Sequence, residues 1–339
     1  VFFNPVAQAK FVHTVSAGYV CGSVFVLTIS AIYLLQGRYK EFAKRSMTVA
    51  ASFGLASALS VVVLGDESGY TAGQNQKMKI AAIEAMWDTE PAPASFTLFG
   101  LPDLAAHKTN YEIKVPWVLG LIATRSSDQV VPGIDQLVDQ AKGHIANGAL
   151  AYRTLQQVRA HPKDAALRTQ LEAHVGDLGY GLLLKRFRPD IENATADDIA
   201  KAAASTIPDV PVLFWSFRFM VGIGFWFIAL FAVAFWLSAK RQLDKYKSFL
   251  WAAVLTFPLP WVAIELGWIV AEYGRQPWAV VGVLPTALGV SSTDANNVLF
   301  SLLGFVIFYS ALLVADVYLL QKFIRLGPQE TIELPEDAT

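Results

Sequence analysis

The sequence predicts an all-α membrane protein: a polytopic bundle of transmembrane helices with a long external, mostly helical loop. The first observation is that 54% of the 339 residues are hydrophobic and only 16% are charged, whereas soluble domains average about 25% charged residues. The second is that residues 11–36 and 46–65 contain no Asp, Glu, Lys or Arg. A helix needs roughly 20 apolar residues to cross a bilayer core, and both stretches are long enough.

Three further apolar stretches follow after a long polar interval. We therefore predict five spans, at residues 11–36, 46–65, 211–237, 248–272 and 297–321. The net charge of −1 gives no electrostatic reason to expect a nucleic-acid partner. The single cysteine, Cys21, excludes an internal disulfide. The opening "VFFNPVAQAK" lacks the charged start of a signal peptide, and we expect the chain to be a piece of a longer protein.

Basic residues in the short loops predict the orientation. The loops "GRYKEFAKR" (37–45) and "SAKRQLDKYK" (238–247), and the segment "KFIR" after the last span, all fall on one side of a five-span chain. That side should be cytoplasmic, which places residues 66–210 outside. The predicted organisation is spans one and two in 1–65, the external domain in 66–210, spans three to five in 211–325 and a cytoplasmic tail in 326–339.

The external interval is too long for a simple connection. It contains a Pro-rich stretch at 89–103, followed by helix-like stretches at 136–161, 167–175 and 194–205. Thr195 is suited to cap the last of these helices. We expect a small, mostly helical domain that is weakly packed on its own.

Ionisable residues inside spans are costly and are candidates for function. They are His13 in span one, Arg218 in span three, Glu265 and Glu272 in span four, and Asp316 in span five. His13, Arg218 with the nearby Met220, and Glu272 all belong to the outer ends of their spans, next to the large external loop. This clustering in one leaflet predicts a functional centre there.

An imidazole and a thioether are suitable axial ligands for a low-spin haem. His13 and Met220 both have small neighbours four residues away, as a planar macrocycle requires: Ala9, Ala17, Ser216 and Gly224. Arg218 beside such a ligand can pair with a haem propionate or adjust the potential.

Simpler interpretations remain open for each residue. His13 can be hydrogen-bonded to a neighbouring helix, and Met220 can be core filler. Arg218 can extend its charged end to the interface, and Glu272 with Arg275 can be an i,i+3 pair that closes a helix. Glu265 and Asp316 can be hydrogen-bond partners between helices.

Several separated motifs resemble subunit I of the cytochrome bd quinol oxidases. They are "NPVAQAKFVHTVSAGYV" (4–20), "LGDESGY" (64–70), "KIAAIEAMW" (79–87), "DLGYGLLLKR" (177–186), "FRFMVG" (217–222), and "GRQPW" followed by "LPT" (274–278, 284–286). They occur in the order of that family and cover nearly the whole chain, to about "RLGP" (325–328). The resemblance is therefore specific.

The resemblance implies residue roles. The His and Met ligands of the low-spin b haem fall on His13 and Met220, and the arginine near this haem falls on Arg218. The glutamate that binds the high-spin b haem falls on Glu272, with Trp268 close by; Arg275 would then lie beside haem propionates. Residues that matter for quinol oxidation fall on Lys79 and Glu84, which are about 140° apart on a helix and are not expected to pair.

The resemblance also implies the function of a terminal quinol oxidase in the bacterial inner membrane, with residues 66–210 as the periplasmic quinol loop. Quinol, as ubiquinol or menaquinol, would be oxidised outside, and oxygen would be reduced to water with protons from the cytoplasm, without pumping. Beside the two b haems, a third haem of d or b type is implied, as are subunit II, a small accessory subunit and membrane lipid. The family has four more helices before the position of Val1, carrying a ligand of the oxygen-reducing haem. This chain by itself is therefore not expected to be active.

Two alternatives come from other classes. One is a haem-bearing membrane anchor that only relays electrons to a partner enzyme. The other is a haem-free transporter, which would favour broken helices or an inverted repeat, and the sequence suggests neither.

Overall fold

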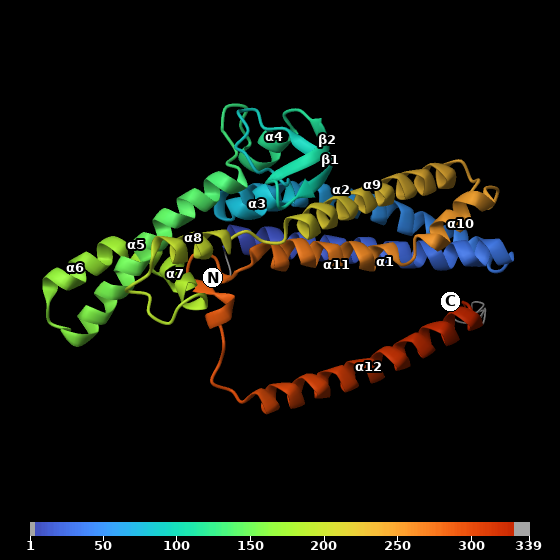
Figure 1. Ribbon diagram of the computed structural model, residues 1–339. Coiled ribbons are helices and arrows are strands. Elements are labelled where there is room, and N and C mark those ends of the chain that lie inside the picture. Colours follow the sequence, from blue (N-terminus) through green and yellow to red (C-terminus); the bar gives the residue numbers. More distant parts are fainter. Residues whose placement is uncertain (1–3, 329–339) are drawn as a thin grey trace. The chain divides into compact units, whose positions relative to one another are not determined.

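The computed structural model describes residues 4–328, and within that range the chain is predominantly helical (Figure 1). Five helical segments of the described part are long and apolar enough to cross a membrane: Val6–Gln36, Lys40–Asn75, Val210–Ala239, Lys247–Arg275 and Ala295–Leu326. The prediction of an all-α membrane protein with five spans is confirmed. Most of the predicted cytoplasmic tail, residues 329–339, lies outside the described range.

The first two spans belong to longer helices than the charge-free stretches predict. Helix α1 covers Pro5–Gln36 and α2 covers Lys40–Asn75. Helix α2 thus continues ten residues beyond residue 65, through Asp66 and Glu67. Charged residues limit how much of a helix lies in hydrocarbon but do not end the helix, so composition gave the span and not the helix boundary.

The predicted fourth span is present as Lys247–Arg275, but it contains a break, although the sequence suggested no broken helix. Helix α10 covers Lys247–Leu255 and α11 covers Leu259–Glu272. Pro258 lies between them, and proline has no N–H to donate and clashes with the preceding turn. The other two spans are continuous: α9 covers Val210–Ala239 and α12 covers Ala295–Leu326.

The segment between α2 and α9 contains helices α3 to α8. They cover Lys77–Ile83, Val118–Thr124, Ile134–Ala160, Ala165–His174, Leu178–Leu182 and Ala196–Ala204. Helices α5, α6 and α8 agree with the three predicted helices. Thr195 caps α8 in a capping box with Asp198, in which each side chain bonds the other residue's backbone N–H.

A β-hairpin in this segment was not predicted. Strand β1 (Phe96–Asp103) pairs antiparallel with β2 (Lys108–Val115), with Phe96 opposite Val115 and Asp103 opposite Lys108. Strand β1 was not predicted because the stretch 89–103 is rich in proline, which is uncommon in strands. After α11, the 3-10 helix η3 (Tyr273–Arg275) leads into a short pair of strands, β3 (Trp278–Val280) and β4 (Leu284–Pro285), followed by η4 (Thr286–Leu288).

The chain divides into two compact units, and helices α1, α2 and α9 contribute residues to both. The first unit contains residues 4–18, 58–226 and 259–290. One of its apolar cores joins Ile80 and Trp87 of the segment between α2 and α9 to Leu213 and Phe214 of α9. This segment therefore does not pack on its own but shares a core with the first turns of α9.

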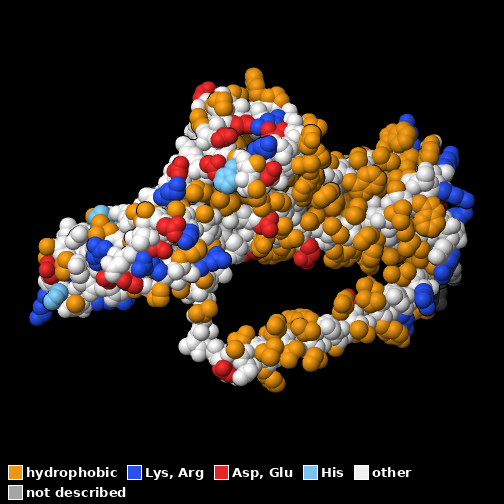
Figure 2. Space-filling model, viewed as in Figure 1, with side chains coloured by type: hydrophobic (Ala, Val, Ile, Leu, Met, Phe, Trp, Pro, Cys, Tyr) orange, Lys and Arg blue, Asp and Glu red, His pale blue; other side chains and the backbone are white. Residues whose placement is uncertain are grey.

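The second unit contains residues 19–57, 227–258 and 291–328. Hydrogen bonds between helices hold it together: Thr28 Oγ1 donates to the Ala253 carbonyl at 3.0 Å, and Tyr33 Oη donates to the Ile324 carbonyl at 2.8 Å. Hydrophobic side chains cover α12, whereas charged side chains gather over α5 and α6 (Figure 2). No residue in the span window of α12 is buried among the described residues, as expected of a surface that meets lipid or other apolar helices.

Candidate functional site

His13 projects from α1 toward α2. A Cβ added to Gly65 of α2 would lie 3.5 Å from His13 Cε1, so the imidazole lies close against this glycine. His13 Nδ1 is buried and has no hydrogen-bond partner within residues 4–328. Leaving a buried nitrogen unsatisfied costs about 1–3 kcal/mol. The imidazole also makes a hydrogen bond to the backbone at Val61 of α2, so the interpretation of His13 as a hydrogen-bonded packing residue stands beside that of a ligand.

Met220 projects from α9 toward α11 in the same unit. Its Sδ atom lies 3.3 Å from the position that a Cβ on Gly267 would occupy. One turn further along α9, a Cβ at Gly224 would meet nothing within 4 Å. Small residues therefore border both predicted ligands, an arrangement that suits a flat macrocycle beside them.

Arg218 does not extend to the interface; its side chain is 7% exposed. Its Nη2 donates to Glu84 Oε2 at 3.1 Å, its Nε to the Thr97 carbonyl at 3.0 Å and its Nη1 to the Phe214 carbonyl at 3.1 Å. The guanidinium also lies 3.5 Å from the centre of the Phe214 ring. These contacts were not predicted from the sequence. They connect β1 and the end of α3 to Arg218 of α9, which lies two residues before Met220.

Glu84 and Lys79 are both buried and lie in different environments. Glu84 Oε2 also accepts from the Thr97 N–H at 2.9 Å, whereas Lys79 Nζ donates to the Ala271 carbonyl of α11 at 2.7 Å. Burial raises the pKa of the Glu84 carboxyl to about 7, although Arg218 and the Thr97 N–H favour its charged form. Burial, together with Lys10 and Arg275, lowers the pKa of Lys79 to about 8. The two residues do not pair, as their spacing suggested.

The ion pair between Arg218 and Glu84 is expected to stabilise the folded protein. Glu84→Ala should leave Arg218 charged and buried, and removing one partner of such a pair costs about 3–5 kcal/mol. Glu90→Ala is the control, because its pair with Lys114 is partly exposed and such pairs contribute about 0–1 kcal/mol. Thermal unfolding of the purified protein should show a much larger loss for Glu84→Ala; equal losses would contradict the structural role.

A polar cavity of about 260 Å³ lies beside Lys79. Its wall comes from the end of α2, from α3, α5 and α7, and from the turn after α11. The lining residues that carry polar or aromatic groups are Gln74, Asn75, Gln76, Lys77, Lys79, Gln140, His144, Tyr180, Thr206, Arg275, Gln276 and Trp278. Glu84 is not among them. The cavity can hold a polar ring-sized molecule, and its cations favour one with ionisable hydroxyls.

Sequence reasoning did not select His144, Tyr180 or Gln140 as site residues. Tyr180 and Trp278 lie in the motifs "DLGYGLLLKR" and "GRQPW", which were noticed only for their resemblance. No local pattern connects them to Lys79, because their neighbourhood depends on how α5, α7 and the turn after α11 pack.

The end of α11 places Glu272 and Arg275 together. Arg275 Nη2 donates to Glu272 Oε2, which is the i,i+3 pair considered from the sequence. Arg275 Nε is buried without an acceptor in the described part of the chain. Glu265, Trp268 and Glu272 are spaced along one helical face; Glu265 and Trp268 are exposed, and the Glu272 side chain is 42% exposed. Such a face requires a polar or charged group against it.

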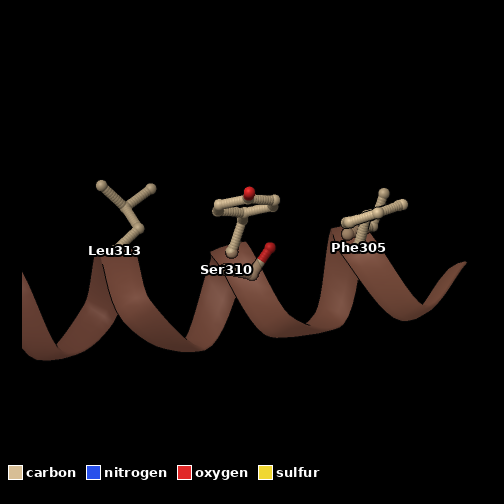
Figure 3. Close-up of a pocket in the computed structure, with 5 residues that line it drawn as sticks. Phe305, Ser310 and Leu313 are labelled. Carbon is tan, nitrogen blue, oxygen red and sulfur yellow. The ribbon is translucent and has the colours of Figure 1, made fainter. Parts of the chain in front are cut away.

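A larger depression, of about 350 Å³, lies along α12 and is lined by Phe305, Val306, Tyr309, Ser310 and Leu313. Phe305 and Leu313 project from the same side of the helix (Figure 3). All five residues belong to one helix and none is charged. A depression along a single helix without a charged group does not make a functional site.

The chain belongs to the family of cytochrome bd terminal oxidase subunit I, whose family model matches residues 1–328. It is 40% identical over 326 residues to cytochrome bd-II ubiquinol oxidase subunit 1 of Escherichia coli, covering 96% of this chain and 63% of the relative. It is 28% identical over 327 residues to cytochrome bd ubiquinol oxidase subunit 1 of Bacillus subtilis, covering 96% of this chain and 58% of the relative.

The solved structure of bd oxidase from Geobacillus thermodenitrificans has the same fold, with a TM-score of 0.66 at 22% identity, over 96% of this chain and 60% of that one. The chain thus spans about three fifths of the length of its relatives. The family and the five apolar helices make it a bacterial membrane protein. The resemblance found in the separated motifs is confirmed.

Proposed function

We propose that this chain is the part of a bd-type quinol:oxygen oxidoreductase that oxidises quinol at the outer face of the membrane and carries two b-type haems. The observation that carries the proposal is the match of residues 1–328 to subunit I of the terminal oxidases. The polar cavity at Lys79 and the unsatisfied nitrogen of His13 support it.

His13 and Met220 would hold the low-spin b haem, and small residues beside them leave room for it. Glu272 would hold the high-spin b haem, with Trp268 beside it. Arg275, whose Nε has no acceptor among the described residues, would bind a haem propionate, since charge-assisted bonds of this kind are strong. The haems supply one-electron transfer when bound.

Arg218 is expected to act near the low-spin haem through its place in the chain, two residues from Met220. Its side chain is directed to Glu84 and the Thr97 carbonyl, so it would fix the geometry of α9 and add a positive charge nearby. Glu84, also proposed as a quinol-site residue, would act through Arg218, because the carboxylate is absent from the cavity wall.

The remaining parts of the proposal concern the assembly. The oxygen-reducing haem, of d or b type, would be completed by helices that precede this segment in the family, and subunit II and a small accessory subunit would be partners. Ubiquinol or menaquinol would be the donor. Its protons would leave on the outer side, and oxygen would become water with cytoplasmic protons.

The decisive experiment is an absorption spectrum of membranes that contain the full-length subunit with its partners, before and after addition of quinol. Three haems that are reduced by quinol and reoxidised by oxygen are expected. A single b haem without oxygen reactivity would favour the electron-relaying anchor, and absence of haem would favour the transporter.

The topology follows from the basic loops. Reporter fusions at Gln136 and Lys245 should report opposite compartments, with Gln136 periplasmic and Lys245 cytoplasmic, because Lys and Arg in short loops remain on the cytoplasmic side. The same compartment for both fusions would contradict the five-span arrangement.

A substitution of Lys79 tests whether the cavity binds quinol. Lys79→Ala should raise the KM for quinol and leave the haem spectra unchanged, because the side chain lines the cavity and its Nζ is anchored on Ala271. The control is Lys142→Ala, which removes an exposed lysine paired with Asp139 on α5. Steady-state quinol oxidation measures both, and an unchanged KM in Lys79→Ala would remove Lys79 from the site.

A further inference from the structure

His144 and Asp177 form a side-chain pair at the cavity wall. His144 Nδ1 lies 2.8 Å from Asp177 Oδ1, and Asn147 Nδ2 donates to Asp177 Oδ2 at 2.6 Å. A carboxylate accepts hydrogen bonds and does not donate them, so Nδ1 of His144 carries the proton. In the neutral imidazole this leaves the lone pair on Nε2, the nitrogen that can accept a proton.

The backbone packing of α5 and α7 produces this pair. A Cβ on Gly148 of α5 would lie 2.2 Å from the Asp177 carbonyl, and a Cβ on Gly181 would lie 2.4 Å from the backbone of Gly148. Only glycines allow this approach. Asn147 and Gly148 lie three and four residues after His144, one turn further along α5, so the close contact at Gly148 brings the side chains of His144 and Asn147 to the carboxylate of Asp177.

The imidazole is fixed on its other faces as well. Its ring is stacked on Tyr180, with centroids 5.0 Å apart and planes inclined by 28°, and Tyr180 meets Trp278 edge to face at 5.0 Å. His144, Tyr180 and Trp278 all line the cavity that also contains Lys79. A general base needs both a fixed tautomer and a fixed ring, and His144 has both.

The charges around the cavity suit an acidic hydroxyl. Lys77, Lys79 and Arg275 line it, and no carboxylate is among the lining residues. Asp177 contacts His144, and its negative charge would offset the positive charge of a proton on His144. Cations lower the pKa of a nearby hydroxyl. The cavity volume of about 260 Å³ lies just below the usual 300–1,000 Å³ of small-molecule sites, so it fits a ring headgroup whose tail remains outside.

We propose that His144, oriented by Asp177, is the general base that takes a proton from a quinol hydroxyl in this cavity. The proposal rests on the proposed quinol oxidase function. Oxidation of one quinol to quinone releases two protons and two electrons. His144 Nε2 accepts the proton of one hydroxyl and passes it to external water, since its side chain is half exposed. The other hydroxyl loses its proton to water, and the two electrons would pass one at a time to the haems of the proposed oxidase.

A second histidine of the chain provides a matched control. His107 Nδ1 lies 2.8 Å from Asp135 Oδ1, and its ring is stacked on Trp87 at 4.7 Å. The side-chain exposures are also alike, 51% for His107 and 49% for His144. His107 does not line the cavity. The two pairs therefore differ in their access to the cavity and not in their internal geometry.

The experiment compares His144→Gln with His107→Gln in the full-length oxidase with its partner subunits. General-base catalysis contributes about 10²–10⁴-fold, so His144→Gln should lower kcat for quinol oxidation about a hundredfold with intact haem spectra. His107→Gln should match wild type. A wild-type rate in His144→Gln would overturn the proposal.

Asp177→Asn gives a second, independent test. An amide can donate to Nδ1 and so move the proton of His144 to Nε2, which blocks acceptance; kcat should fall while quinol KM changes little. If His144→Gln does not assemble, this variant decides: a wild-type kcat in Asp177→Asn overturns the proposal.

Binding supplies a readout without turnover. A short-chain benzoquinol monomethyl ether keeps one hydroxyl and does not form a quinone by loss of hydrogen. Calorimetry should show that wild type binds it more tightly than His144→Ala, which has no side-chain acceptor for the remaining hydroxyl. Equal affinity of the two proteins overturns the proposal. A wild-type complex without quinol oxidation would instead refute the proposed function.

Discussion

Met220→Leu in the full-length subunit is expected to abolish the low-spin b haem signal and quinol oxidation with it. Leucine matches methionine in volume, and such exchanges usually cost less than about 1.5 kcal/mol in a core. The change therefore removes the thioether and little else. His13→Ala should have the same spectral effect, because a low-spin haem needs both axial ligands.

The structure adds a reason to expect this result. His13 Nδ1 is buried without a partner in the described range, and Gly224 leaves open space one turn from Met220. A bound group would account both for the unpaired nitrogen of His13 and for the open space at Gly224. The measurement is the reduced-minus-oxidised spectrum of the purified complex.

Met47→Leu is the matched control, since Met47 is fully buried in the second unit and has no proposed ligand role. It should leave the spectrum and the activity unchanged. An intact low-spin spectrum in both His13→Ala and Met220→Leu would return these residues to the simpler interpretations of packing and core filling.

Glu272→Ala is expected to remove the high-spin b haem and oxygen reduction while the low-spin haem of His13 and Met220 remains. If Glu272 only closes α11 through its pair with Arg275, its loss should cost about 0.5 kcal/mol and no chemistry. If its carboxylate binds iron, the loss removes a ligand for which alanine has no substitute. The first interpretation thus predicts a small loss of stability, whereas the second predicts loss of the haem and of its chemistry.

The control is Glu41→Ala, because Glu41 forms an i,i+3 pair with Lys44 at 3.6 Å and is mostly exposed. It removes a comparable ion pair without a proposed iron ligand. Haem content per protein and oxygen consumption should be normal in Glu41→Ala and strongly reduced in Glu272→Ala. Full haem content with normal oxygen consumption in Glu272→Ala would leave the pair with Arg275 as the whole role of Glu272.

The sequence by itself determined the class of the protein, because membrane crossing is a local property. Charge-free stretches such as 11–36 and 46–65 require a bilayer whatever the rest of the chain does. Helices α5 and α8 were also predictable, since periodicity and the Thr195 cap act within a few residues. His13 and Met220 were selected because chemically suitable ligands are rare in spans and these two have small neighbours.

Only the tertiary structure decided which distant groups meet. The hairpin of β1 and β2 depends on cross-strand pairing, which a Pro-rich stretch does not reveal. The bond between Glu84 and Arg218 joins residues 134 positions apart, so neither residue's own neighbourhood predicts it. The pairing of His144 with Asp177 depends on the backbone approach of α5 and α7 at Gly148. Buried charges and close contacts find their partners through packing, and spacing along the chain does not encode that packing directly.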